Sequence, residues 1–209
     1  MTETRTLRRD ATENRQALLV AAKAVLNRDP DASLETIAAE AGLSRRAVYG
    51  HFATREALVG EVVALGVARV ADALTQVRHP DPLVQLALIA AELWREVEHV
   101  RVMAMFAVRG PLIEVVTDAL RPLRARVLES VRDGAADGSI RTDIDAVVLA
   151  RLIESAAIAV LDESNRRPID SGTGCRLAML AVLSCAGLDW REAGRLIDST
   201  PELSPAGGK

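Results

Sequence analysis

The sequence of 209 residues is poor in the side chains that most often carry enzyme chemistry or bind metal ions. It has three histidines, two cysteines, two tryptophans, two phenylalanines and one tyrosine. Cys175 and Cys185 fall on one expected helix, where ten residues separate them by about 15 Å, too far for a disulfide within the chain. We therefore expect two free thiols, as in a protein of the reducing cytoplasm.

Long hydrophobic segments are also missing. The longest uninterrupted apolar runs, 102–108 and 177–183, have seven residues each, whereas a helix needs about 20 apolar residues to cross a bilayer. The N-terminal stretch MTETRTLRRD has no apolar core and does not have the pattern of a secretory signal. These absences predict a cytoplasmic protein that does not insert into a membrane.

The chain has no overall excess of positive charge either. Its formal net charge is −3, which argues against indiscriminate binding of nucleic acid. Any contact with DNA must therefore come from a local basic face. Two arginine clusters are the candidates: Arg5, Arg8 and Arg9, and Arg45, Arg46 and Arg55. Acidic residues also occur within the first 55 residues, so this region is not uniformly basic: Asp29, Asp31, Glu35 and Glu40.

Apolar residues recur at helical spacing along most of the chain, and no segment alternates as a strand would. Ser33 is a good N-cap for the second of these helices and Gly42 ends it. Thr54 caps a long fourth helix that His79-Pro80 stops. An all-α fold follows, with helices expected at residues 11–27, 34–41, 45–51, 54–78, 81–98, 143–161, 175–186 and 190–197, and a broken helical region at 99–133.

The stretch SRRAVYGHFATREAL, residues 44–58, holds the single tyrosine, one histidine and one phenylalanine beside an arginine pair. Together with the preceding helix it reads as a helix-turn-helix, with Ala38 at the helix crossing and Gly42 in the turn. A second helix of this kind fits the major groove with its early residues facing base edges. The same Ala-x3-Gly pattern occurs in plain helical hairpins. The motif alone therefore leaves open a helical scaffold or ligand-binding protein that does not touch DNA.

The longer segment TIAAEAGLSRRAVYGHFATREALVGEVV closely resembles the DNA-binding domain of the TetR (tetracycline-repressor-like) family of bacterial transcription regulators. The match covers residues 14–63, and its most specific part is Ala-Gly-Leu-Ser followed by Val-Tyr-x-His-Phe. The resemblance implies an all-helical chain of about nine or ten helices. It implies a helix-turn-helix domain at 1–53, an effector-binding and dimerisation domain at 54–199 and a flexible tail at 200–209.

The resemblance also implies the function. The protein is expected to be a homodimeric, sequence-specific transcriptional regulator that binds a double-stranded DNA operator. We expect a repressor that an unknown small-molecule effector releases from that operator, with no enzymatic activity, cofactor or metal.

Eight residues are the candidate DNA contacts. Ser33, Tyr49 and His51 match positions that touch the phosphate backbone in the family, and Arg55 stands where the family usually has lysine. Gly50 removes a side chain that some relatives use for reading, so readout is expected to depend on the start of the third helix. The complete predicted set is Ser33, Ser44, Arg45, Arg46, Ala47, Tyr49, His51 and Arg55.

The C-terminal domain is predicted in less detail. The helices 143–161 and 175–186 carry more apolar residues than one helix face can bury within its own chain, which suits a dimer interface. Methionine and aromatic residues suit an adaptable apolar pocket, although each of them fits a simple core equally well. The candidate effector-binding residues are Trp94, His99, Met103, Met105, Phe106 and Arg109.

Two enzymatic alternatives are weaker. Glu96 and His99 have the i, i+3 spacing of carboxylate-bridged metal bundles, but such sites need a second pair, and neither His51 nor His79 supplies it. One pair gives two ligands where most metal sites need three or four. No Ser, His and Asp occur in a strand-turn-helix context, so a hydrolase triad is not indicated.

Overall fold

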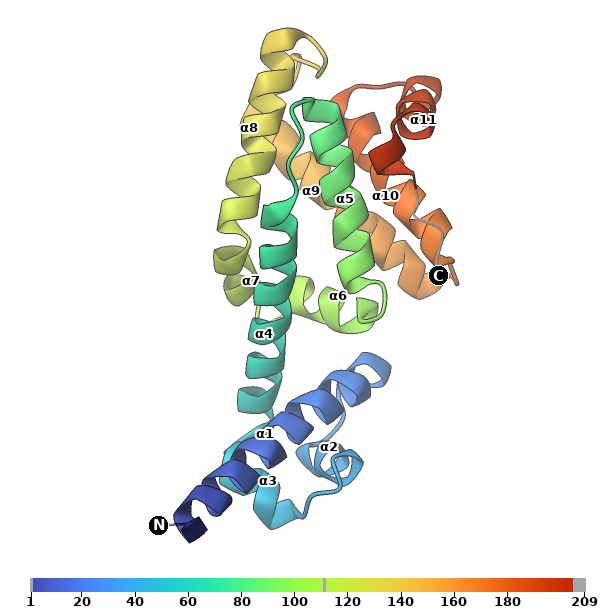
Figure 1. Ribbon diagram of the computed structural model, residues 1–209. Helices are drawn as coiled ribbons and strands as arrows, with labels where there is room; N and C mark the ends of the chain where they lie inside the picture. Colours follow the sequence, from blue (N-terminus) through green and yellow to red (C-terminus); the bar gives the residue numbers. More distant parts are fainter. Residues whose placement is uncertain (1, 111, 205–209) are drawn as a thin grey trace. The chain divides into compact units, whose positions relative to one another are not determined.

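The computed structural model describes residues 2–110 and 112–204, with side chains from residue 12 onward. The described chain contains helices and no strand, so the predicted all-α fold is confirmed (Figure 1). The region 99–133 resolves into three helices, so the described residues form eleven α-helices where nine or ten were expected. Their bounds are α1 Thr2–Arg28, α2 Leu34–Glu40, α3 Arg45–His51, α4 Arg55–Gln76, α5 Pro82–Val97, α6 Arg101–Arg109, α7 Ile113–Ala119, α8 Arg121–Asp137, α9 Ala146–Arg166, α10 Ser171–Ala186 and α11 Trp190–Ser199.

The helices form two compact units. The first unit comprises Met1–Gly66 and Val102–Val116, and the second comprises Val67–Arg101 and Thr117–Lys209. The helix α4, 22 residues long, contributes to both. The first turns of α4 belong with the N-terminal helices because Leu58, Val59 and Val63 are buried. The compact units therefore divide α4 near residue 66, and the domain boundary at residue 53 stays a prediction.

In the first unit, α1 packs against α2 and α2 against α3 (Figure 1). The core side chains Leu18, Leu26, Ile37 and Val48 are fully buried. Apolar residues at helical spacing on α1 thus meet the inner face of α2, which in turn packs on α3. This arrangement fixes the orientation of α3 relative to α2.

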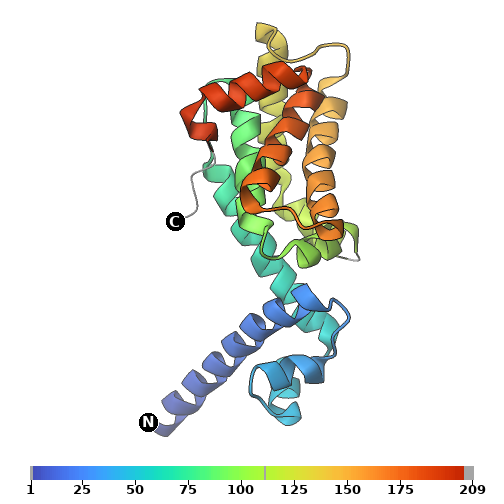
Figure 2. The same cartoon turned by 90° about the vertical axis from the view of Figure 1, so that its right-hand side faces the viewer.

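The second unit is a helical bundle in which α10 packs against both α5 and α9, and α8 packs against α5 and α9 (Figures 1 and 2). The helices α5 and α10 approach each other closely. A Cβ atom on Gly174 would lie 1.8 Å from the ring of Trp94. Glycine at this position therefore lets the indole ring fill the space between the two helices.

The C-terminal segment differs from its prediction. A short 3-10 helix, η1 (Pro201–Leu203), packs on α5 and α11, and Leu203 is 1 % exposed. The buried leucine holds the segment in place, so the predicted flexible tail was wrong for residues 200–203. Residues 205–209 lie outside the described part of the chain.

Cys175 and Cys185 are both free thiols. Burial raises the pKa of each thiol, with the nearby Arg95 opposing the effect at Cys175. Within the described range, no helix has both the length and the apolar character needed to cross a bilayer.

Candidate nucleic-acid interface

The turn between α2 and α3 is built by side-chain and backbone hydrogen bonds. Ser33 and Ser44 are the N-caps of the two helices, and their hydroxyl oxygens accept hydrogen bonds from the backbone nitrogens of Thr36 (3.1 Å) and Ala47 (3.2 Å). Gly42 has a φ of 68°, the left-handed conformation that glycine adopts without strain. Two of the predicted DNA contacts, Ser33 and Ser44, therefore have a first role in starting their helices.

The helix α3 shows a buried face and an outer face. Val48 is fully buried and Phe52, the C-cap, is 3 % exposed. The side chains of Arg45, Arg46 and Tyr49 are exposed. Ala47 and His51 are half-buried at the edge of that surface. The fold thus presents two arginines and a tyrosine on the outer side of α3, as the helix-turn-helix pattern predicts.

Glu35, in the first turn of α2, lies beside this surface. One carboxylate oxygen, Oε1, accepts a hydrogen bond from the Tyr49 hydroxyl at 3.0 Å and lies 3.3 Å from Arg45 Nε. The Arg45 guanidinium is also 5.6 Å from the centre of the Tyr49 ring. A hydrogen bond from its own backbone amide and another from Tyr49 lower the pKa of Glu35, so the carboxylate is ionised at neutral pH.

Sequence reasoning treated Glu35 only as an acid that dilutes the local positive charge. The α2–α3 crossing brings its carboxylate to residues 10 and 14 positions further along the chain. The only signal in the sequence was an acidic residue in the first turn of the second helix, which helix geometry alone would explain.

Arg55 has a contact that the sequence did not predict. Its Nε donates a hydrogen bond to the carbonyl oxygen of Ala32 at 2.8 Å, and its Nη2 donates to the carbonyl of Pro30. These bonds tie the α1–α2 loop to the first residue of α4. Phosphate binding by Arg55 stays a prediction, and it would have to use the remaining donors of the guanidinium.

Arg15 makes a second connection within the same unit. Its guanidinium pairs with Glu61 on α4 and stacks over the Phe52 ring, 4.9 Å from the ring centre. It therefore joins α1 to both the end of α3 and the start of α4. The side chains of Arg5, Arg8 and Arg9, the predicted N-terminal cluster, lie outside the described part of the structure.

The predicted effector-binding residues are distributed over both units. Trp94 is 1 % exposed, packs against Gly174 and donates from Nε1 to Glu98 Oε2 at 3.0 Å, so its environment is that of a core residue. The His99 side chain is 85 % exposed in the same unit. Four candidates on α6 belong to the first unit: Met103 and Met105 are buried, Phe106 is half-buried and Arg109 is exposed.

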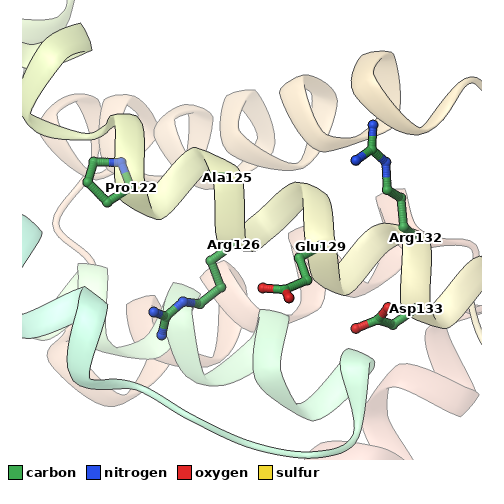
Figure 3. Close-up of a pocket in the computed structure, with 6 residues that line it drawn as sticks. All are labelled: Pro122, Ala125, Arg126, Glu129, Arg132 and Asp133. Atoms are coloured by element: carbon green, nitrogen blue, oxygen red, sulfur yellow. The ribbon is translucent and has the colours of Figure 1, made fainter.

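A groove of about 420 Å³ lies on α8 (Figure 3). The side chains of Arg126, Glu129 and Asp133 lie along one side of the helix, and Arg132 points away from them. Arg126 is engaged in the structure, since its Nη1 donates to the carbonyls of Thr75 (3.0 Å) and Val77 (2.7 Å) at the end of α4. None of the predicted effector-binding residues lines this groove, whose lining is Pro122, Ala125, Arg126, Glu129, Arg132 and Asp133.

The Glu96 carboxylate, one half of the metal-site alternative, pairs with Arg69, whose Nη2 also donates to the Glu96 carbonyl at 3.0 Å. Where side chains are described, no three or more His, Cys, Asp or Glu residues are grouped so that they could hold a metal ion.

Residues 18–62, which span the core of α1 through the first turns of α4, match the model of the family described as "Bacterial regulatory proteins, tetR family". This segment of the chain is a tetR-family domain. The predicted resemblance is thereby confirmed, and the match coincides with the caps, the Gly42 turn and the exposed arginines of α3. The protein is accordingly a DNA-binding transcriptional regulator.

Solved structures with the same fold extend over most of this chain. One is RolR in complex with the ligand resorcinol, at 22% identity, covering 93% of this chain and 97% of RolR with a TM-score of 0.60. SmeT, the repressor of the Stenotrophomonas maltophilia multidrug efflux pump SmeDEF, is 23% identical over 81% of this chain and 88% of its own, with a TM-score of 0.63. A tetR-family regulatory protein from Rhodococcus RHA1 is 22% identical, with 84% and 98% coverage and a TM-score of 0.68. No curated protein sequence matches the chain.

Proposed function

We propose that this regulator is a cytoplasmic repressor that binds a two-fold symmetric operator as a homodimer and leaves it when a small molecule binds. The observation that carries the proposal is the outer face of α3, where Arg45, Arg46 and Tyr49 are exposed while Val48 and Phe52 anchor the helix. An anchored helix with basic, hydrogen-bonding side chains on its outer face is suited to the major groove.

The proposed roles differ along α3. Arg45 and Arg46 read base edges, where a guanidinium can bond both acceptors of a guanine. The Ala47 methyl group contacts a base edge, and Tyr49 and His51 donate to phosphate oxygens. Ser33 and Ser44 place backbone nitrogens at helix starts, where anions bind favourably.

The proposed dimer surface is on α9 and α10. These two helices pack side by side and leave four large apolar side chains substantially exposed: Val147 (39%), Val148 (48%), Leu152 (44%) and Leu177 (39%). Exposed apolar side chains on two adjacent helices favour covering by another protein surface. A second copy of the chain is the simplest cover, because one two-fold axis would bury the same face on both copies.

The effector side of the proposal is less specific. Met103, Phe106 and Arg109 on α6 combine adaptable apolar contacts with one charged group, a composition that suits a small apolar molecule with one polar end. The solved complexes of RolR with resorcinol and of SmeT with triclosan support such ligands as first candidates for screening. Trp94 is a weaker candidate since its ring is enclosed, and His99 is weaker because it is exposed.

Effector and operator are proposed to oppose each other. Such coupling is typically of the order of 1–3 kcal/mol and must be reciprocal, so saturating operator weakens effector binding by the same factor. A ligand found by thermal-shift screening can be titrated with and without operator. Equal affinities would exclude coupling, and tighter binding with operator would make the ligand a co-repressor.

The test of DNA recognition is selection of binding sites from a random duplex library by the full chain, followed by footprinting. We expect enrichment of a pseudo-palindrome whose half-site centres are one helical turn, about 34–36 Å, or a multiple apart. An asymmetric footprint of monomer size would contradict the proposal.

A further inference from the structure

Glu35 contacts two of the side chains that are proposed to bind DNA, the base reader Arg45 and the phosphate contact Tyr49. Its Oε1 accepts a hydrogen bond from the Tyr49 hydroxyl at 3.0 Å and lies 3.3 Å from Arg45 Nε, while 43% of the Glu35 side chain remains exposed. The three groups therefore form one surface cluster at the start of α2 and α3. A carboxylate at the centre of a DNA-reading surface needs an explanation, because it repels phosphate.

The two partners of Glu35 differ in how many donors they have. Tyrosine has a single O–H, so the Tyr49 hydroxyl can donate either to Glu35 or to a phosphate oxygen at any moment. Arginine has five N–H donors in a fixed plane. When Glu35 engages Nε, Arg45 keeps Nη1 and Nη2 for a base edge, and the guanidinium is already oriented by the carboxylate and by the Tyr49 ring.

These two contacts affect different kinds of DNA differently. Any duplex that uses Tyr49 for a phosphate contact must displace Glu35 and approach its negative charge, which weakens binding to all sequences. A duplex with the correct base also gains from an Arg45 side chain that has already lost part of its rotamer freedom. The cost is common to all DNA, but the gain is restricted to the operator.

We propose that Glu35 sets the discrimination between operator and other DNA, by orienting Arg45 for base readout and by competing with phosphate for Tyr49. It is a positioning residue that acts through Arg45 and Tyr49. The proposal rests on the DNA-reading role of α3 given above, and it adds a specificity determinant on α2.

The experiment uses the full chain and two duplexes of equal length, the operator selected by the wild-type protein and a shuffled version of it. Fluorescence anisotropy gives the Kd for each duplex. The variants are Glu35→Gln, which removes only the charge, and Glu35→Asp, which keeps the charge but shortens the side chain. The matched control is Glu40→Gln, because Glu40 is on the same helix, has a 46% exposed side chain and pairs with Arg28.

For Glu35→Gln we expect binding to the shuffled duplex to tighten about three- to fivefold, the size of one exposed charge interaction. Operator binding should weaken about two- to threefold as Arg45 loses its orientation, so the specificity ratio falls about tenfold. Glu35→Asp should keep the weak binding to the shuffled duplex, because the negative charge remains. It should lower the affinity for the operator, because the shorter side chain no longer orients Arg45. Glu40→Gln should change both affinities equally.

The double variant with Arg45→Ala separates positioning from simple charge. In the Arg45→Ala background, Glu35→Gln should still tighten binding to the shuffled duplex but should no longer weaken binding to the operator. Equal tightening of both duplexes by Glu35→Gln, or identical behaviour of Glu35→Gln and Glu40→Gln, would overturn this inference while leaving DNA recognition intact. A wild-type protein that enriches no sequence would instead overturn the proposed function, and this inference with it.

Discussion

The two compact units expose surfaces of opposite chemistry. On the first unit, the outer face of α3 presents Arg45, Arg46 and Tyr49, together with a carboxylate from α2. On the second, α9 and α10 present apolar side chains such as Leu152 and Leu177. A charged surface stays hydrated until a polyanion arrives, while exposed apolar side chains are costly in water at all times. Under the proposed function, the first surface binds DNA reversibly and the second is covered by a second copy of the chain.

The largest effect is expected at the apolar surface. Leu152→Arg would bury an unpaired guanidinium twice in a symmetric dimer, which costs more than about 4 kcal/mol. We expect a monomer by size-exclusion chromatography with light scattering, and loss of operator binding.

The matched control for this substitution is Trp190→Arg on α11, since Trp190, at 70%, is the most exposed large apolar residue among the side chains that the structure describes. It should leave the dimer unchanged. A dimer that survives Leu152→Arg but dissociates with Trp190→Arg would move the interface to α11.

The core of the second unit is expected to be almost as sensitive. Gly174→Ala would place a methyl group inside the van der Waals radius of the Trp94 ring, and we expect a loss of about 1–3 kcal/mol in the free energy of unfolding. Gly172→Ala, two residues earlier on α10, meets only Asp170 Oδ1 at 3.5 Å and should be neutral. Denaturant unfolding monitored by tryptophan fluorescence measures both, and equal stabilities would mean that α5 and α10 can separate at no cost.

At the basic surface the expected effects are on DNA binding. Arg45→Ala and Arg46→Ala should each cost about 1–3 kcal/mol on the operator and relax the preference at one base position per half-site. Repeating the site selection with each variant checks this. An arginine whose removal weakens all sequences equally would be a phosphate contact and not a reader.

The smallest of these effects separates two roles of Arg55. Loss of its hydrogen bonds to the carbonyls of Ala32 and Pro30 should lower the free energy of unfolding of Arg55→Ala by about 1–2 kcal/mol. Arg55→Lys should recover only part of this, because a single ammonium cannot reproduce the planar fork. If the free energy of unfolding is unchanged and the slope of log K for DNA binding against log salt concentration becomes shallower by about one per half-site, Arg55 binds phosphate instead.

The helix ends and the outer face of the helix-turn-helix could be predicted from the sequence because local rules determine them. Ser33, Ser44 and Gly42 mark helix ends through hydrogen bonds to neighbours within three residues, and these caps are present in the structure. The outward position of Arg45 and Tyr49 follows from the same local periodicity.

Contacts between distant parts of the chain could not be predicted in this way. The Arg15–Glu61 pair, the Arg55 bonds to the α1–α2 loop and the Glu35 cluster depend on how helices cross, which no local pattern encodes. Trp94 was a candidate for the effector pocket because of its residue type alone, whereas Gly174, 80 positions away, determines that the indole is enclosed. The buried Leu203 was missed because Ser, Pro and Gly around it resemble a tail.

The arginine connections in the first unit have a consequence for how such a regulator can diverge. Arg15 and Arg55 hold α1, the α1–α2 loop and α4 together through Phe52, Glu61 and two backbone carbonyls, and none of these partners is among the proposed base-reading residues. Substitutions at the start of α3 can therefore change the preferred operator without loosening the support beneath it. After gene duplication, the preferred operator sequence can therefore change while the stability of the DNA-binding unit is retained.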